Sequence, residues 1–471
     1  MAKRKVILGP TFEEMLDPQK MDASTRQRAQ EAMVEDPLDP VNFFNITWKG
    51  PENQIRYVVL PEKLTGVKAK IVVLYGKDFP TMSHKVGATY SILMELVVRN
   101  LVDPYEHTLV WPSTGNYGIG GAWVGCRMGF DTVVILPELM SKERFDLIES
   151  YGARVIATPG CESNVKEIYD KAKELKAENP EKVRVLNQFE EFGNYRFHYY
   201  VTGNTILELL HQLEKEGTIH GGASAVVSSM GSAGTIACGD RLKEVYPHCL
   251  IVGSEPIQCP TLIANGYGGH DIQGIGDKHV TWIHNVMNMD AMVAVDDVES
   301  KKGLQLLTDP VGKDFLVSQV GIPRQEVEFL SQVFGISGVC NVLSAIKAAK
   351  YYDMGEEDTL ITIATDNIQR YGSVMEQLDA SFGPMDTMEA AVRFQSIFMG
   401  VKTDWLQEGT YEVRKRWHNL KYYTWVEQQG KSVEELNLTR TRGFWDNQKK
   451  MVQQSDELLR NFRRTGDIPT Y

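Results

Sequence analysis

A lysine at the start of an apolar segment is the first candidate for chemistry in this sequence. The stretch FPTMSHKVGATYSILMEL places Lys85 just before residues with helical spacing, at Val86, Tyr90, Leu93 and Val97. Lysine is almost never fully buried without a partner, so Lys85 either reaches solvent or has its amine consumed. A desolvated amine loses its proton readily and then attacks carbonyl groups to form Schiff bases.

A glycine-rich segment, VVSSMGSAGTIACGDRL, follows a predicted strand and opens a predicted helix. Its turn can present backbone N–H groups and hydroxyls to an anion, most often a phosphate, from Gly231, Ser232, Ala233, Gly234 and Thr235. The alternative is a plain strand-to-helix turn that uses glycine only for its backbone angles. The segment lacks the G-K-[ST] of a nucleotide-binding P-loop, so that type of nucleotide binding is not expected.

A second polar turn lies in LVWPSTGNYGIGGAWVGCRMG, where Ser113, Thr114, Gly115 and Asn116 stand between a predicted strand and a helix of small residues. Hydroxyls, an amide and free N–H groups at a helix start suit a carboxylate. The alternative is a capped helix pressed tightly against a sheet. One amine, one phosphate turn and one carboxylate turn in a single chain are what pyridoxal phosphate requires, so the sequence indicates this cofactor.

The elements that must hold these residues alternate between strands and helices. Short β-branched runs predict strands at 70–75, 107–111, 131–137, 153–159, 224–229, 250–256 and 359–366. Amphipathic segments lie between several of them, such as 142–152, which ends on a glycine. This alternation predicts an α/β fold with mostly parallel sheets.

Composition excludes several classes of protein. A net charge of −12 and a pI near 5.4 argue against phosphate-backbone binding as the main role, so no nucleic-acid partner is expected. The six cysteines are scattered with no C-x-x-C pair, which predicts reduced thiols, no metal site and a cytoplasmic location. The start of the chain has no long apolar run and no window reaches 18 apolar residues, so neither a signal peptide nor a membrane span is expected.

The chain divides into three parts by its pattern. Residues 1–50 are polar and read as an N-terminal extension, and residues 51–385 as the catalytic core, with a small mobile subdomain at roughly 86–200. Residues 386–471 are rich in Trp, Arg, Gln and Glu and predict a helical C-terminal extension used for packing or oligomerisation.

The order of motifs resembles the cysteine synthase and cystathionine β-synthase family of fold type II pyridoxal-phosphate enzymes. Residues 113–120 (STGNYGIG) resemble T-S-G-N-T-G-I-G, and 231–235 (GSAGT) resemble the G-T-G-G-T phosphate loop. Further similarities cover roughly residues 70–375, in NQF (187–189), SEP (254–256), IQGIG (272–276), GISG (335–338) and RY (370–371). Together these matches are specific, although each alone is weak.

The resemblance implies a role for each matching position. Lys85 holds the cofactor as an internal aldimine and moves the α-proton, Asn116 contacts the ring oxygen, and residues 231–235 hold the phosphate. Ser337 is the candidate partner of the pyridine nitrogen. The substrate carboxylate is expected among Ser113, Thr114, Gly115, Asn116, Tyr117 and Gln188.

The sequence departs from the family pattern at four places. Ser83-His84-Lys85 is similar to the tryptophan synthase β subunit of the same fold type, and His84 either touches the phosphate and tunes Lys85 or packs and caps the helix start. Tyr117 replaces a threonine. Ala233 replaces a glycine and needs a backbone angle that alanine tolerates. The motif at Ser337 is one residue shorter than in the family.

The implied activity is β-replacement or β-elimination on an amino acid with a β-leaving group, through an aminoacrylate, most like cysteine synthase. The alternative is a lyase, of the cysteine desulfhydrase or serine/threonine ammonia-lyase type, that releases a keto acid and ammonia. A non-catalytic amino-acid-binding regulator is a second alternative, which the retained Lys85 disfavours. The family habit also implies a homodimer or higher homo-oligomer with no membrane partner.

Overall fold

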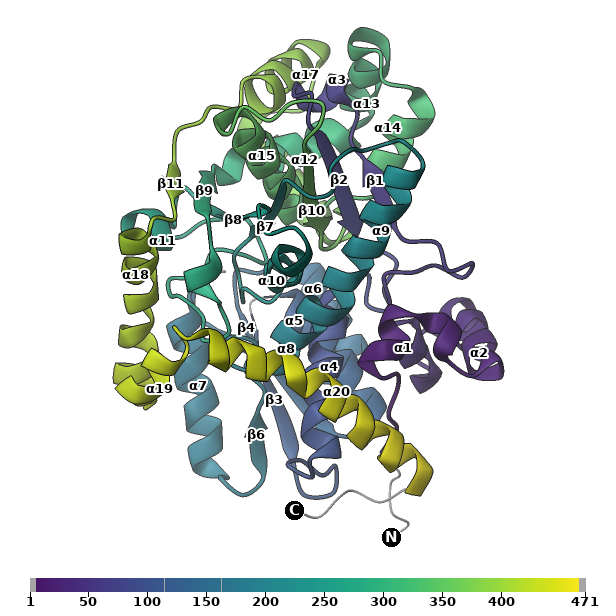
Figure 1. Ribbon diagram of the computed structural model, residues 1–471, viewed down its shortest axis with the longest axis vertical. Helices are drawn as coiled ribbons and strands as arrows, with labels where there is room; N and C mark the ends of the chain where they lie inside the picture. The colour runs from purple at the N-terminus through teal and green to yellow at the C-terminus, as the bar shows by residue number, and fades with distance from the viewer. Residues whose placement is uncertain (1–5, 114, 162, 466–471) are drawn as a thin grey trace.

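The strands form two separate sheets in the computed structural model, which describes residues 6–113, 115–161 and 163–465 (Figure 1). The larger sheet has seven strands in the order β1-β2-β10-β7-β8-β9-β11, and the smaller has four in the order β5-β4-β3-β6. The strands are β1 (Tyr57–Val59), β2 (Lys70–Tyr75), β3 (Thr108–Pro112), β4 (Asp131–Pro137), β5 (Arg154–Thr158), β6 (Val183–Val185), β7 (Ala225–Ser229), β8 (Leu250–Pro256), β9 (Ala291–Val295), β10 (Thr359–Ala364) and β11 (Leu406–Glu408).

Both sheets are parallel except at the edges of the larger one, where β1 pairs antiparallel with β2 and β11 with β9. The inner strands read as continuous apolar runs because both faces are covered, as in β10, where every residue is buried. These observations confirm the predicted α/β class with mostly parallel sheets. The C-terminal extension is helical as expected, but it also contributes β11, a three-residue edge strand.

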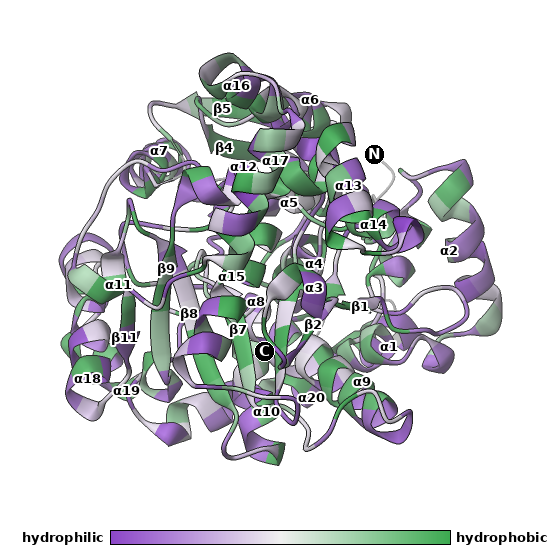
Figure 2. Cartoon of the chain, turned by 90° about the horizontal axis from the view of Figure 1, so that it is seen from above, coloured by the Kyte–Doolittle hydropathy of each residue, from purple (hydrophilic) through white to green (hydrophobic). Residues whose placement is uncertain are grey.

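The helices cover the sheets and fill the extensions. They are α1 (Phe12–Leu16), α2 (Ala23–Glu35), α3 (Glu62–Thr65), α4 (Lys85–Val98), α5 (Asn116–Met128), α6 (Lys142–Ser150), α7 (Val165–Glu178), α8 (Phe192–Arg196), α9 (Gly203–Lys215), α10 (Ala237–Val245), α11 (Thr261–Ala264), α12 (Asp297–Thr308), α13 (Pro310–Phe315), α14 (Arg324–Leu330), α15 (Ile336–Tyr351), α16 (Gly372–Phe382), α17 (Thr387–Arg393), α18 (Tyr411–Asn419), α19 (Val433–Leu438) and α20 (Arg442–Thr465). Peripheral helices such as α7 mix hydrophilic and hydrophobic stretches (Figure 2), as amphipathic covering helices do.

The apolar core forms two large clusters. One contains residues of α4, α5, α9 and the smaller sheet, and the other packs α12 and α15 against the opposite face of the larger sheet. Helix α4 is buried along almost its whole length, from Lys85 to Val98. The helix that begins with the candidate lysine is therefore buried in the core, where it packs against α5 and α8.

The C-terminal helix α20 crosses the molecule and lies against α4 and α8 (Figure 1). A buried ion pair joins Glu95 of α4 to Arg196 of α8, with Arg196 Nε 2.7 Å from Glu95 Oε1. Ser455 of α20 donates to the same carboxylate at 2.9 Å. The tail thus fixes the far end of the helix that carries Lys85.

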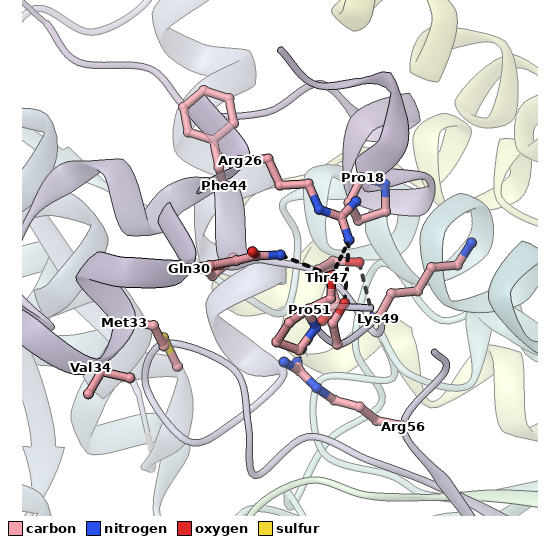
Figure 3. Close-up of a pocket in the computed structure, with 12 residues that line it drawn as sticks. Pro18, Arg26, Gln30, Met33, Val34, Phe44, Thr47, Lys49, Pro51 and Arg56 are labelled. Atoms are coloured by element: carbon pink, nitrogen blue, oxygen red, sulfur yellow. Dashed lines mark hydrogen bonds between the residues drawn. The ribbon is translucent and has the colours of Figure 1, made fainter. Parts of the chain in front are cut away.

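The N-terminal extension is clamped to the core as well. A pocket of about 140 Å³ lies between α2 and residues 44–56, and all its lining residues fall between positions 18 and 56 (Figure 3). Arg26 and Gln30 of α2 both donate to the Pro51 carbonyl, at 2.9 and 3.0 Å. Lys49 then reaches Glu208 of α9 at 2.9 Å. Within the described ranges, no helix is long and apolar enough to cross a membrane.

Candidate active site

The predicted site residues follow the carboxyl ends of parallel strands from both sheets. Strand β2 leads to Lys85, β3 to Ser113 and Asn116, and β7 to the turn at 230–236. In open parallel sheets this edge is where ligands bind, because the strand-to-helix turns gather there. Residues far apart in the sequence are thereby brought to one place.

Lys85 is buried, and its amine faces the glycine-rich turn. The side chain is the first residue of α4, with 8% of its surface exposed. Its Nζ lies 3.4 Å from the Oγ of Ser232. The lysine therefore does not reach out to solvent, and its amine points to the turn predicted to bind phosphate.

The turn itself is built from side-chain hydrogen bonds and one essential glycine. Ser232 Oγ accepts from Asn194 Nδ2 at 2.9 Å and from the Gly234 backbone N–H at 3.3 Å. A Cβ at Gly234 would lie 2.0 Å from Asn194 Oδ1, so no larger residue fits there. The turn leads into α10, whose N-terminal N–H groups favour an anion. Asn194 is a site residue that sequence reasoning missed.

Ala233 has a left-handed backbone, with φ of +62°. The sequence comparison led us to expect an angle that alanine tolerates. Alanine does adopt this conformation, but at a cost of about 1–2 kcal/mol relative to the right-handed region. The turn therefore holds local strain that a glycine at the same position would not have.

His84 links the lysine segment to the phosphate turn. Its Nε2 lies 3.2 Å from Thr235 Oγ1, and its ring stacks on Trp48 at 5.5 Å. Its side chain makes no capping hydrogen bond to α4. Burial lowers the pKa of His84 to about 3, and the charge of Lys85 acts in the same direction, so the imidazole is neutral.

The second polar turn supplies Asn116 and the start of α5. Ser113 Oγ accepts from the backbone N–H groups of Gly115 and Gly118, at 3.0 and 2.7 Å, which places its hydroxyl at the start of α5. The hydroxyl of Tyr117 donates to the Leu186 carbonyl at 3.0 Å. Thr114 lies outside the described residues. The N-cap of α5 is Gly115, without a side-chain cap, so Ser113 is not the N-cap, although its hydroxyl accepts from an N–H group in the first turn of the helix.

Asn116 contacts an acid that sequence reasoning missed. Its Nδ2 donates to Asp366 Oδ2 at 2.6 Å, and Tyr371 donates to the same oxygen at 2.8 Å. In the described part of the chain, the Oδ1 atoms of Asn116 and Asp366 are buried without a hydrogen-bond partner. Asp366 is the first acid after β10, and that position at a carboxyl strand end was the signal that could have found it.

Gln188 and Ser337 complete the set of predicted residues. Gln188 is buried, and its carbonyl accepts from Asn194 at 3.1 Å, beside Ser232. Ser337 is buried in the first turn of α15. The preceding Gly335 lies so close to Asp366 that a Cβ there would be 2.0 Å from Oδ1. Gln188 therefore lies next to Asn194, which contacts the turn that Lys85 faces, and Ser337 lies two residues after the glycine that packs on Asp366.

This arrangement fits pyridoxal phosphate on the structure's own terms. A buried amine faces an anion-binding turn with two hydroxyls, Ser232 and Thr235. The amide oxygens of Asn116, which contacts Asp366, and of Asn194, which contacts Ser232, are buried and, across the described residues, accept no hydrogen bond. Buried polar atoms without a partner are rare, and a bound group or an ordered water is one way in which they are satisfied.

Comparison with known proteins decides the family. The model of the family "Pyridoxal-phosphate dependent enzyme" matches residues 60–310. The chain belongs to this family. A cysteine synthase of Staphylococcus aureus is 33% identical over 265 residues, which is 56% of this chain and 75% of that protein. A cystathionine beta-synthase of Saccharomyces cerevisiae is 28% identical over 320 residues, covering 66% of this chain and 58% of that one.

Solved structures show the same fold. The cysteine synthase of Entamoeba histolytica matches with a TM-score of 0.58 and 23% identity, over 73% of this chain and 92% of that one. The resemblance to the cysteine synthase and cystathionine β-synthase family, the fold type II class and the cofactor are thereby confirmed. This pyridoxal-phosphate enzyme uses pyridoxal 5′-phosphate, and β-replacement of the cysteine synthase type is the chemistry that its relatives support.

Proposed function

We propose that this enzyme acts on an amino acid with a β-leaving group, of the O-acetylserine, cysteine or serine type, and replaces that group with a nucleophile, most like a cysteine synthase. The observation that carries the proposal is the buried amine of Lys85, 3.4 Å from the Ser232 hydroxyl in an anion-binding turn. When bound, the cofactor draws electrons from the α-carbon of the amino acid and makes its proton acidic.

In this proposal each site residue has its own role. Lys85 Nζ binds the cofactor and moves the α-proton, because it is the buried amine at the site. The N–H groups and hydroxyls of residues 231–235 bind the phosphate. Neutral His84 fixes the position of the Thr235 hydroxyl through a hydrogen bond. Asn116 contacts the ring oxygen, and Ser337 lies near the pyridine nitrogen. A neutral hydroxyl in that place leaves the ring a weaker electron sink, which suits loss of a β-group.

The substrate carboxylate is bound at the start of α5. Its neighbours in this proposal are Ser113, Thr114, Gly115, Asn116, Tyr117 and Gln188. Ser113 and Tyr117 already use their hydroxyls within the chain, and the N–H groups of Gly115 and Gly118 donate to Ser113, so the remaining backbone N–H groups of this turn are the donors we expect. We further propose that residues 86–200, which contain the smaller sheet, close over the substrate as a unit.

The test is an absorption spectrum of the purified enzyme followed by product analysis. We expect a visible cofactor band that is absent in Lys85→Ala, and cysteine formed from O-acetylserine and sulfide. Release of a keto acid and ammonia, with or without sulfide, would instead identify the lyase alternative. A cofactor band with no turnover of any amino acid would favour a binding protein, and no band after cofactor addition would refute the proposal.

The oligomeric state and the cellular location of the enzyme are also proposals. We propose a homodimer or higher homo-oligomer in the cytoplasm, supported by the family resemblance and by six cysteines that are all free. Light scattering of the purified full chain measures the mass of the assembly directly. A monomer at micromolar concentration would contradict the first part.

A further inference from the structure

Two side chains of the C-terminal extension hold a segment of the catalytic core by its backbone carbonyls. Lys421 and Trp425 are fully buried and lie four residues apart in the helical stretch that follows α18. Lys421 Nζ donates to the carbonyls of Trp282 and His284, at 2.9 and 2.8 Å. Trp425 Nε1 donates to the Val280 carbonyl at 2.8 Å. The extension thus binds every second carbonyl along this segment.

The same segment, residues 280–284, also contacts the turn predicted to bind the phosphate. Thr281 is buried, and its Oγ1 donates to the Ser232 carbonyl at 2.8 Å. Shortly before the segment, the Gly276 N–H donates to the Met230 carbonyl, also at 2.8 Å. Two carbonyls of the turn therefore point toward this part of the chain.

These two bonds orient the backbone donors of the turn. A trans peptide unit is planar, so its carbonyl and its N–H point in opposite directions. The N–H groups of Gly231 and Ala233 directly follow the two bound carbonyls, and they therefore point away from residues 276–281. Ser232 lies between them, with its Oγ 3.4 Å from Lys85 Nζ. The bonds to the neighbouring segment thus determine which donors of the turn an anion can reach.

The core and the extension bind different groups of the segment. The N–H groups of Trp282 and Ile283 donate to the Phe189 carbonyl in the core, at 2.8 and 3.3 Å. The carbonyls receive their hydrogen bonds from Lys421 and Trp425 of the extension. A buried carbonyl that loses its donor keeps the cost of desolvation. Without these two side chains the segment would shift toward another donor and move Thr281 with it.

We propose that Lys421 and Trp425 are positioning residues of the cofactor site. Through Thr281 they hold the turn at residues 231–235 in the form that binds the phosphate. The C-terminal extension thereby sets the affinity of the enzyme for a phosphorylated cofactor. This inference rests on the proposed role of residues 231–235 in binding the phosphate, and it holds whichever nucleophile the enzyme uses.

The proposal predicts an effect that depends on the phosphate group. Pyridoxal has the ring and the aldehyde of pyridoxal 5′-phosphate but lacks the phosphate. A shift of the turn should therefore weaken the binding of the phosphorylated compound and leave that of pyridoxal nearly unchanged. General damage to the fold would weaken the binding of both compounds.

The test measures the Kd of each compound from its visible absorption band, using the full chain after removal of the cofactor. We expect Thr281→Val to raise the Kd of pyridoxal 5′-phosphate by about 10-fold, the effect of one hydrogen bond, and that of pyridoxal by less than about 2-fold. Lys421→Met and Trp425→Phe should raise the former by about 3- to 10-fold. Thr281→Ser keeps the hydroxyl and should recover most of the loss.

The matched control is Trp445→Phe in the same extension. Trp445 is buried, and its Nε1 donates to the Thr439 carbonyl at 2.8 Å. This variant loses the same donor over the same length as Trp425→Phe, but its acceptor lies within the extension and outside residues 280–284. We expect it to leave the ratio of the two Kd values at the wild-type value.

The phosphorus NMR resonance of the bound cofactor gives a readout at the phosphate itself. We expect it to move in Thr281→Val and Lys421→Met and to stay in place in Trp445→Phe. Trp425→Phe keeps a buried aromatic ring, so it tests the inference even if Lys421→Met does not fold.

The two proposals fail in different ways. A wild-type ratio of Kd values in both Lys421→Met and Trp425→Phe would overturn this inference alone, as would an equal loss of affinity for both compounds. A wild type that binds pyridoxal as tightly as pyridoxal 5′-phosphate would overturn the phosphate role of residues 231–235 and the inference with it.

Discussion

The side-chain amide of Asn116 donates a 2.6 Å hydrogen bond to Asp366, which lies 250 residues further along the chain. This bond joins the start of α5, next to the smaller sheet, to the end of β10 in the larger one. The bond thus crosses between the carboxyl ends of strands from the two sheets, where the substrate is expected. It therefore couples the placement of the substrate turn to the larger sheet.

Replacing Asp366 should weaken both the fold and the site. In Asp366→Ala, Asn116 and Tyr371 lose their shared acceptor, and buried donors left unpaired cost about 1–3 kcal/mol. We expect a lower free energy of unfolding in urea and a raised KM for the amino acid. Tyr371→Phe, which removes one donor and leaves the acceptor in place, should cost about 1 kcal/mol. Equal stability of Asp366→Ala and wild type would contradict the role given to this acid.

A glycine at position 233 should stabilise the enzyme. The left-handed backbone of Ala233 costs the folded state about 1–2 kcal/mol. Glycine removes this strain, but its greater freedom in the unfolded chain lowers the stability by about 0.4–1 kcal/mol. The expected net gain for Ala233→Gly is about 0.5–1 kcal/mol in urea unfolding. The control is Ala177→Gly on the exposed face of α7, which should lower stability by about 0.5–1 kcal/mol. A loss in both variants would argue against strain at position 233.

Breaking the buried ion pair of α4 should loosen the C-terminal helix. Arg196→Met removes the charge that faces Glu95 and also the contact with Gln448 of α20, and breaking a buried pair costs about 3–5 kcal/mol. We expect reduced stability and faster proteolysis within residues 442–465. Lys68→Met, which breaks the exposed pair with Glu356, should change little. Unaltered cleavage of the tail would show that α20 is held by its apolar contacts.

The buried Lys421 should make the stability of the folded protein increase with pH. Its Nζ donates to the carbonyls of Trp282 and His284, at 2.9 and 2.8 Å, and burial lowers its pKa to about 7. The unfolded lysine titrates near 10.4, so between about pH 7 and 10 the unfolded chain binds the extra proton and stability rises with pH. Lys421→Met should lack this rise. Unfolding midpoints of the two proteins across this range measure it, and parallel curves would contradict a neutral Lys421.

Much of the fold was readable because buried parallel strands leave a strong pattern. The predicted strands at 70–75, 131–137 and 250–256 coincide with β2, β4 and β8. The sequence reading missed β1, β6 and β11, since three-residue segments have too few side chains to show a period. It also missed β9, whose five buried residues form a short apolar run that periodicity does not distinguish from a buried helix.

The candidate site was also predictable from the sequence only in part. The sequence by itself determined the local turns: Lys85 at a helix start, the phosphate turn at 231–235 and Asn116 after a strand, because each depends on neighbouring residues. Only the tertiary structure decided which distant groups face them, namely Asn194 and Asp366. Burial and pairing, which set the charge and hydrogen-bonding needs of these side chains, depend on packing between segments that are far apart in the sequence.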